Sequence, residues 1–97
     1  MPADLLEFPT VEARDEAWIS AAVEIVTCVR LGGKLWRTSW LPKQISQAAQ
    51  EARECEAALK ATGHSKEVMI YAVTAQGRSA LIPRERWVNL PSPAETR

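Results

Sequence analysis

The stretch PKQISQAAQEARECEAALKATG, residues 42–63, decides the fold because it reads as one amphipathic helix with its own start and stop. Pro42 suits a first helical position, where the missing N–H would be unpaired anyway. Gly63 suits the position just past the end, where a left-handed backbone is accessible to glycine. The apolar residues recur at three- and four-residue steps and are Ile45, Ala48, Ala49, Ala52, Cys55 and Leu59. This stripe is mostly alanine, so the helix can lie close to a covering layer, which we expect to be a sheet.

A β-hairpin is predicted before this helix. The run VEIVTCVRL, residues 23–31, is rich in β-branched residues, and Gly32-Gly33 after it suits a two-residue hairpin turn. Pairing outward from the turn aligns three favourable cross-strand pairs on one face, which we expect to lie under the helix. These pairs are Val29 with Trp36, Thr27 with Thr38, and Ile25 with Trp40. The other face carries Val26, Cys28, Arg30, Leu35, Arg37 and Ser39, and we expect it to face solvent.

Residues 23–31 also fit a continuation of a preceding helix. Helical spacing is kept by Trp18, Ala22, Ile25 and Val29, and Gly32 would then end that helix. The pairing across the two glycines favours the strand, and the sequence leaves the helix open as the alternative.

A second hairpin is predicted after the helix. VMIYAVTA, residues 68–75, has the composition of a strand, Gln76-Gly77 suits a turn, and SALIP, residues 79–83, suits the partner strand. Proline cannot donate to a ladder, so Pro83 belongs at a strand end or on an edge. Both faces of this hairpin are largely apolar, so the pattern does not select the face that packs on the core.

The chain before the first hairpin begins with residues 1–9, MPADLLEFP, which we interpret as a flexible arm. Thr10 can cap a short helix from Val11 to about Ala22, whose buried contacts would be Trp18 and Ile19. Residues 10–88 then form a single domain, and residues 89–97 form a frayed tail. The expected fold class is α+β, with a short helix followed by hairpin, long helix and hairpin, and a helix packed on an antiparallel sheet.

Composition places limits on the class of protein. The 97 residues suit one small domain, and the formal net charge is zero, so strong nonspecific attraction to nucleic acid is not expected. No apolar run approaches the roughly 20 residues of a membrane span, and the N-terminus lacks the pattern of a signal peptide. Two cysteines imply no disulfide framework, so we expect a protein of the reducing cytoplasm.

Catalytic groupings are not found in the pattern. His64 is the only histidine and has no nucleophile or carboxylate at a recognised catalytic spacing. Cys28 and Cys55 lack the spacing and the companions of a zinc site, and both suit small apolar positions. We therefore expect no enzyme, no metal and no cofactor.

Charge and tryptophan are distributed unevenly. Six acidic residues precede position 32, whereas basic residues predominate beyond it outside the central helix. The segment RERW ends the second hairpin, and its tryptophan suits an interface anchor, a platform for a base, or a residue that closes the core. The candidate partner-binding residues are Arg30, Arg37, Arg84, Arg86 and Trp87.

The layout of three segments resembles small phage-encoded proteins, including some anti-CRISPR proteins. The segments are SQAAQEA at 46–52, VMIYAVTAQGRSALI at 68–82 and RERWV at 84–88. The resemblance implies a non-enzymatic inhibitor that binds a CRISPR effector complex and blocks a surface meant for DNA. It covers less than half of the chain and assigns no role to any single residue.

The sequence thus favours a non-catalytic protein-binding domain, and the resemblance implies an inhibitor of the phage type. The alternative is a small nucleic-acid-binding module that uses the same arginines and tryptophans. An enzyme that uses His64 with a cysteine is a third hypothesis. The exposed edges of a four-stranded sheet would also permit a homodimer.

Overall fold

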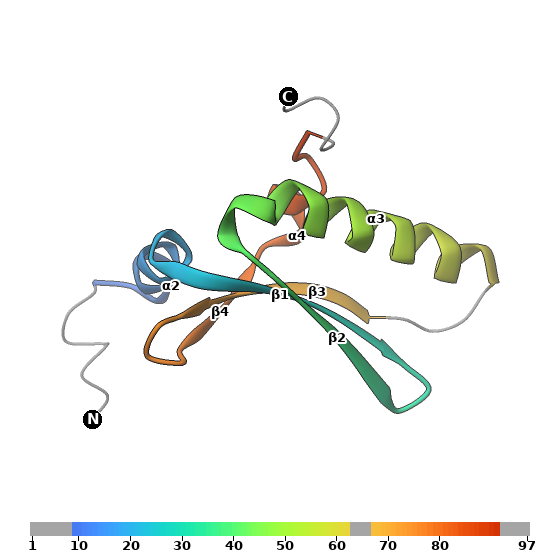
Figure 1. Cartoon of the computed structure of the whole chain (residues 1–97), viewed down its shortest axis with the longest axis horizontal. Helices are drawn as coiled ribbons and strands as arrows, with labels where there is room; N and C mark the ends of the chain where they lie inside the picture. Colours follow the sequence, from blue (N-terminus) through green and yellow to red (C-terminus); the bar gives the residue numbers. More distant parts are fainter. Residues whose placement is uncertain (1–8, 63–66, 92–97) are drawn as a thin grey trace.

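The computed structural model describes residues 9–62 and 67–91, and it is an α+β fold in which helices pack on a four-stranded antiparallel sheet (Figure 1). The elements in chain order are α2 Val11–Ser20, β1 Ala22–Leu31, β2 Lys34–Trp40, the 3₁₀ turn η1 Pro42–Gln44, α3 Ile45–Thr62, β3 Glu67–Thr74, β4 Ser79–Ile82 and α4 Arg84–Trp87. The predicted fold class and the predicted order of elements are confirmed.

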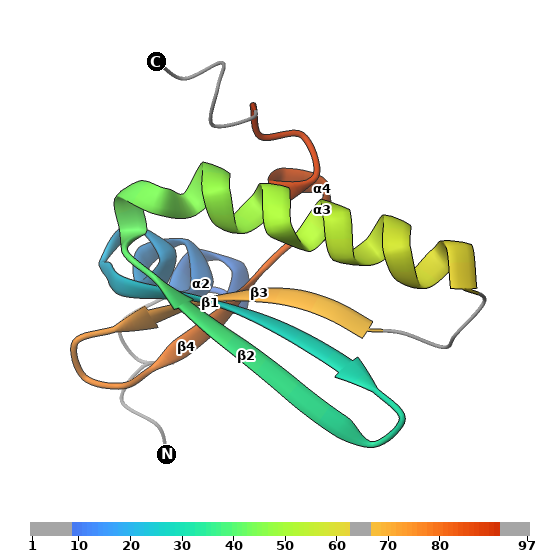
Figure 2. The ribbon, with the colours of Figure 1, turned by 45° about the vertical axis from the view of Figure 1, so that its right-hand side comes forward.

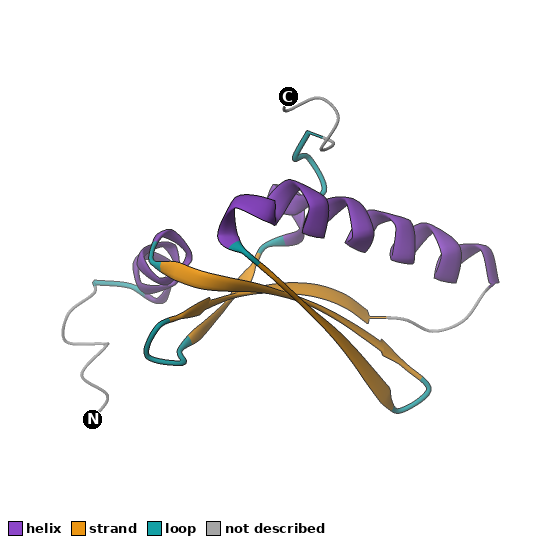
Figure 3. Ribbon diagram, in the orientation of Figure 1, coloured by secondary structure: helices purple, strands orange, loops and turns teal. Residues whose placement is uncertain are grey.

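The strands lie in the order β2-β1-β3-β4, and each neighbouring pair is antiparallel. The two hairpins therefore meet through β1 and β3, and β2 and β4 form the edges. Helix α3 connects one edge strand to a central strand of the other hairpin, and it lies over β1 and β3 (Figure 2). Figure 3 shows α3 and α4 on the same side of the sheet.

The first hairpin has the predicted register. Ile25 faces Trp40, Thr27 faces Thr38 and Val29 faces Trp36. The turn residues Gly32 and Gly33 have φ of 58° and 80°, and positive φ at both positions defines the type I′ turn that suits the twist of a hairpin. Residues 23–31 are therefore a strand, and the alternative helix is excluded.

The central helix also follows its predicted pattern. Pro42 opens the single turn η1, and the α-helix begins at Ile45. Ala48, Ala49 and Ala52 are fully buried against the sheet, because their short side chains let the backbone of α3 approach it closely. A chain of two side-chain hydrogen bonds connects β2, β1 and α3. The indole N–H of Trp40 donates to the Thr27 hydroxyl (Nε1–Oγ1 3.2 Å), and that hydroxyl donates to the Glu51 carboxylate (Oγ1–Oε2 3.1 Å).

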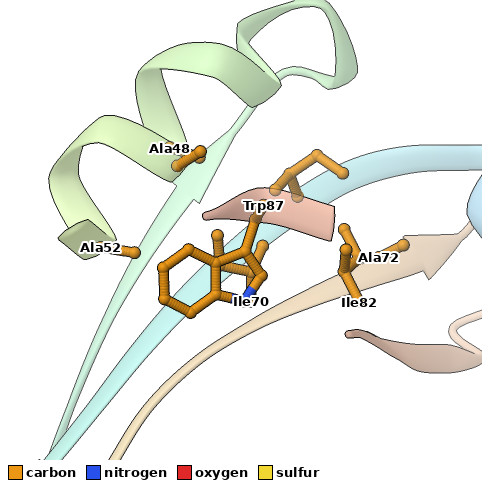
Figure 4. Packing of buried hydrophobic residues seen from close by; sticks show 8 residues of the cluster. Ala48, Ala52, Ile70, Ala72, Ile82 and Trp87 are labelled. Atoms are coloured by element: carbon orange, nitrogen blue, oxygen red, sulfur yellow. The ribbon is translucent and has the colours of Figure 1, made fainter. Parts of the chain in front are cut away.

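Trp87 fills the space that the alanines of α3 leave open. It is 1% exposed and contacts a cluster that includes Ile70 and Ile82 (Figure 4). The guanidinium of Arg53 on α3 fixes the segment after α4, since it donates to the carbonyl oxygens of Trp87 (3.0 Å) and Leu90 (2.9 Å). Burial of an indole of this size makes α4 part of the core layer.

The prediction that Trp36 lies in the core is wrong, because Trp36 is 51% exposed. Its side chain shares a sheet face with Trp40, but α3 covers β1 and β3 and does not extend over the outer part of β2. The twist of the sheet carries the tip of the β1–β2 hairpin away from α3 (Figure 1). The prediction therefore placed Trp36 on the correct face of the sheet, but it did not foresee that α3 leaves the outer part of that face uncovered.

Helix α2 begins as predicted, since the Thr10 hydroxyl accepts a hydrogen bond from the backbone N–H of Ala13 (3.0 Å). It ends at Ser20, and Ile19 packs against the core cluster. Trp18 is half-buried. Leu90, which lies within the predicted C-terminal tail, also packs against the core cluster. Most of the predicted N-terminal arm lies outside the described residues.

Candidate functional site

One face of the sheet is covered by helices and the other is not. We call the second the open face; within the described residues no helix lies over it (Figures 1 and 3). The cross-strand register places on it Glu24, Val26, Cys28, Arg30, Leu35, Arg37, Ser39, Glu67, Met69, Tyr71, Val73, Ser79 and Leu81. About half of these side chains are apolar, although a solvated sheet face is ordinarily polar.

The centre of the open face is hollowed. A hollow of about 330 Å³ is lined by Val26, Cys28, Leu35, Arg37, Tyr71, Val73 and Ser79. Two of its lining residues, Val26 and Cys28, belong to the central strand β1 and are buried. Its sides include Leu35, which is 51% exposed, and Leu81 lies nearby on β4 at 48%. The hollow therefore presents apolar carbon to solvent.

The two arginines on the open face differ in whether they have an ion-pair partner. Arg30 lies 3.7 Å from the carboxylate of Glu67 across the β1–β3 ladder, and both side chains are more than half exposed. Within the described residues, the side chain of Arg37 has no ion pair and no hydrogen bond. Arg37 is thus an uncompensated positive charge on the wall of an apolar hollow.

The five residues predicted to bind a partner do not form one surface. Arg30 and Arg37 lie on the open face, whereas Arg84, Arg86 and Trp87 belong to α4 on the covered side. Burial of Trp87 in the core excludes its roles as an exposed anchor or a base platform, and matches the third role offered by the sequence, a residue that closes the core. A single flat interface cannot contact both groups.

The two arginines of α4 hold helices together. Arg84 makes two hydrogen bonds of 2.8 Å to the Glu56 carboxylate on α3, and this pairing raises the pKa of its guanidinium above the ordinary value. Arg86 pairs with Glu16 on α2. Both arginines therefore have a structural partner, whereas Arg37 has none among the described residues.

A second hollow lies between α3 and α4, with a volume of about 350 Å³. It is lined by Arg53, Glu56, Ala57, Lys60, Arg84 and Val88. Arg53 and Arg84 are engaged in the contacts that join α4 to α3. This hollow is accounted for by helix packing, so it is a weaker candidate than the open face.

Groups that carry chemistry are sparse in the described part of the chain. No cluster of three or more histidine, cysteine or acidic residues is found there that could hold a metal ion. Cys28 and Cys55 are both free thiols, and burial, followed by the charges of Glu51 and Glu54, raises the pKa of Cys55. His64 lies outside the described residues.

Sequence reasoning missed the contribution of the second hairpin to the open face. Tyr71, Val73 and Leu81 were not singled out, because both faces of that hairpin are apolar and the pattern alone does not orient it. The pairing of β1 with β3 decides the orientation, since Ile70 lies opposite Thr27 and Tyr71 opposite Val26. No local sequence signal specifies that pairing.

Comparisons with protein-family models, with curated proteins and with solved structures found no match for this chain. None of the helices in residues 9–62 and 67–91 has the length and apolar character needed to cross a membrane.

Proposed function

We propose that this chain is a non-catalytic protein-binding domain and that the open face is its contact surface. The observation that carries the proposal is the apolar hollow with exposed Leu35 and Leu81 around it and the unpaired Arg37 on its wall. Contiguous exposed apolar surface on a small protein marks an interaction site. Arginine is enriched in such interfaces, whereas lysine and acidic residues are depleted.

The resemblance to phage-encoded inhibitors supports a narrower form of the proposal. In that form the domain acts in the cytoplasm and blocks a host nucleic-acid-processing complex, with a CRISPR effector complex as the first partner to test. Arg30 and Arg37 remain in the proposed contact surface. Arg84, Arg86 and Trp87 leave it, because they are engaged in the helical layer.

The first experiment is capture of a partner from cells by the tagged chain, with and without nuclease. We expect a defined protein partner that survives nuclease and is lost with Leu81→Asp. The matched control is Val11→Asp, because Val11 has the same exposed fraction of 48% but lies on α2. Equal loss of the partner in both variants, or in neither, would contradict the assignment of the open face.

The inhibitor form has its own test. Purified CRISPR effector complex cleaves target DNA in vitro, and the wild-type chain is expected to stop cleavage while Leu81→Asp does not. If every effector complex tried remains active while a captured partner still depends on Leu81, the inhibitor form fails and the protein-binding proposal stands.

A nucleic-acid-binding module is the second candidate, and one observation favours it. Trp36 is half exposed at the tip of a hairpin, and Lys34 lies on the same face two residues away; an exposed ring near a basic side chain can stack on a base. Zero net charge counts against it. Affinity for single-stranded DNA that falls steeply with salt, and with Trp36→Ala, would favour this candidate over the first.

A further inference from the structure

Strand β2 has an unpaired outer edge. It is the outermost strand in the described sheet and pairs with β1 alone. Every residue from Lys34 to Ser39 is exposed, and only Trp40 is half-buried. A strand of this length with an open edge offers a row of backbone groups to another strand.

The hairpin geometry specifies which backbone groups are available. Leu31 and Lys34 flank a two-residue turn, so they form a hydrogen-bonded pair, and such pairs alternate along an antiparallel ladder. Trp36 and Thr38 therefore bond to β1 through their backbone. The N–H and C=O groups that point to the open edge belong to Leu35, Arg37 and Ser39.

The side chains on the two faces of β2 suit an added strand. Leu35 and Trp36 are each 51% exposed and project to opposite faces. Leu35 and Arg37 also line the hollow of the open face. A strand placed beside β2 would thus set alternate side chains against the hollow and the others against Trp36.

The other edge of the sheet is less suited to this role. β4 is only four residues long and is followed by Pro83, which has no N–H to donate. The choice of edge therefore follows from strand length and from the position of proline.

The charge of β2 selects the kind of partner. Lys34 and Arg37 are its only charged residues, so pairing β2 with the same strand of a second copy would place two cationic strands side by side. Opposite charges on neighbouring strands are stabilising, whereas like charges directly opposite each other are not. An acidic strand is complementary, and a second copy is not.

We propose that an extended, acidic segment of a partner protein adds to the outer edge of β2 as a fifth strand, with a carboxylate beside Arg37 and apolar side chains beside Leu35 and Trp36. This inference rests on the proposed protein-binding function and specifies its mode. Backbone hydrogen bonds supply affinity in such strand addition, and the alternating side-chain contacts supply specificity.

The first test is selection of binders from a displayed library of random linear peptides against the full chain. We expect enriched peptides to be acidic with apolar residues at alternate positions. Enrichment of neutral or basic peptides, or of none, overturns the proposal.

The second test locates the peptide by backbone amide hydrogen exchange measured by NMR. In the free protein the outward amides of Leu35, Arg37 and Ser39 should exchange faster than the inward amides of Trp36 and Thr38. A selected peptide should slow the three outward amides by at least about tenfold. Unchanged outward amides in the bound state overturn strand addition.

Two substitutions of Arg37 separate the contribution of its side-chain charge to peptide binding from the contribution of its backbone N–H. Arg37→Gln removes the charge only, whereas Arg37→Pro also removes an outward N–H that does not bond to β1. We expect Arg37→Gln to weaken the peptide roughly threefold, and Arg37→Pro to weaken it a further threefold to tenfold. Equal affinities of the two variants overturn the backbone contact, provided that the β1–β2 register is retained in both.

Failure of this inference is distinguishable from failure of the proposed function. A partner that is lost with Leu81→Asp but leaves the outward amides unprotected docks on the open face alone, which overturns strand addition and keeps the function. Binding of a single-stranded DNA oligonucleotide in place of acidic peptide overturns both.

Discussion

Leu81 and Ile82 are neighbours on β4, and they show how differently the two faces of the sheet are used. Ile82 is 2% exposed and packs with Trp87 beneath the helices, whereas Leu81 is 48% exposed on the open face. Both are large aliphatic residues, so composition does not distinguish them. The covered face therefore buries its large apolar side chains in the core, whereas the open face leaves an equally large apolar side chain exposed to solvent.

The largest expected effect comes from placing a charge on each face in turn. Ile82→Asp buries a carboxylate with no cationic partner, and the effective penalty for such an ion is several kcal/mol, about 4 or more. Because small domains have roughly 5–15 kcal/mol of total stability, we expect this variant to lose a large part of its free energy of unfolding. The measurement is urea denaturation followed by tryptophan fluorescence.

Leu81→Asp is the matched control, and we expect its free energy of unfolding to lie within about 1 kcal/mol of the wild type. If Ile82→Asp yields no folded protein, Ile82→Val should still lose about 0.5–1.5 kcal/mol. Similar losses for Leu81→Asp and Ile82→Asp would show that the open face is covered in solution.

The next largest loss of stability is expected from truncating the buried Trp87, compared with truncating the half-exposed Trp36. Trp87→Ala leaves a cavity between α3 and the sheet, and such truncations cost about 3–5 kcal/mol. Trp36→Ala removes a ring that is half in water, so its cost should be below about 1 kcal/mol. Urea denaturation of both variants gives the comparison, and a larger loss for Trp36→Ala would contradict the assigned core.

The smallest expected effect is a pH dependence of stability and reactivity that arises from Cys55, a partly buried thiol on α3. Burial, then Glu51 and Glu54, favours the neutral thiol and raises its pKa above the ordinary value. Stability from this group is present below the unfolded pKa and is lost as pH rises through the folded pKa. In a Cys28→Ala background, the rate of alkylation by iodoacetamide should rise at higher pH for the native chain than for the chain in urea. Coincident pH profiles would contradict the shift.

Local sequence signals predicted the elements well because their causes are local. The glycine pair Gly32-Gly33 specifies a type I′ turn, and that turn in turn specifies the register that places Ile25 opposite Trp40. The alanine stripe of α3 was correctly assigned to the buried side for the same reason, since helical periodicity is a property of the segment itself.

The candidate site was predicted only in part. Arg30 and Arg37 were placed on a solvent-facing side because the pairing around the turn specifies it. For Trp87 the sequence left three roles open, namely interface anchor, base platform and core closure, and it was included among the partner-binding candidates because Arg84 and Arg86 lie beside it in the chain. The space under α3 that accepts its indole exists only once the alanines, Ile70 and Ile82 are assembled.

The sequence by itself determined the turns, the strand register of the first hairpin and the buried stripe of the long helix, because each depends on residues close together in the chain. Only the tertiary structure decided three further features: which face of β3 and β4 is covered, that Trp36 projects beyond α3, and that Arg37 lies beside an apolar hollow with no ion pair among the described residues. These depend on the pairing of β1 with β3 and on the twist of the sheet, which arise from contacts between distant segments.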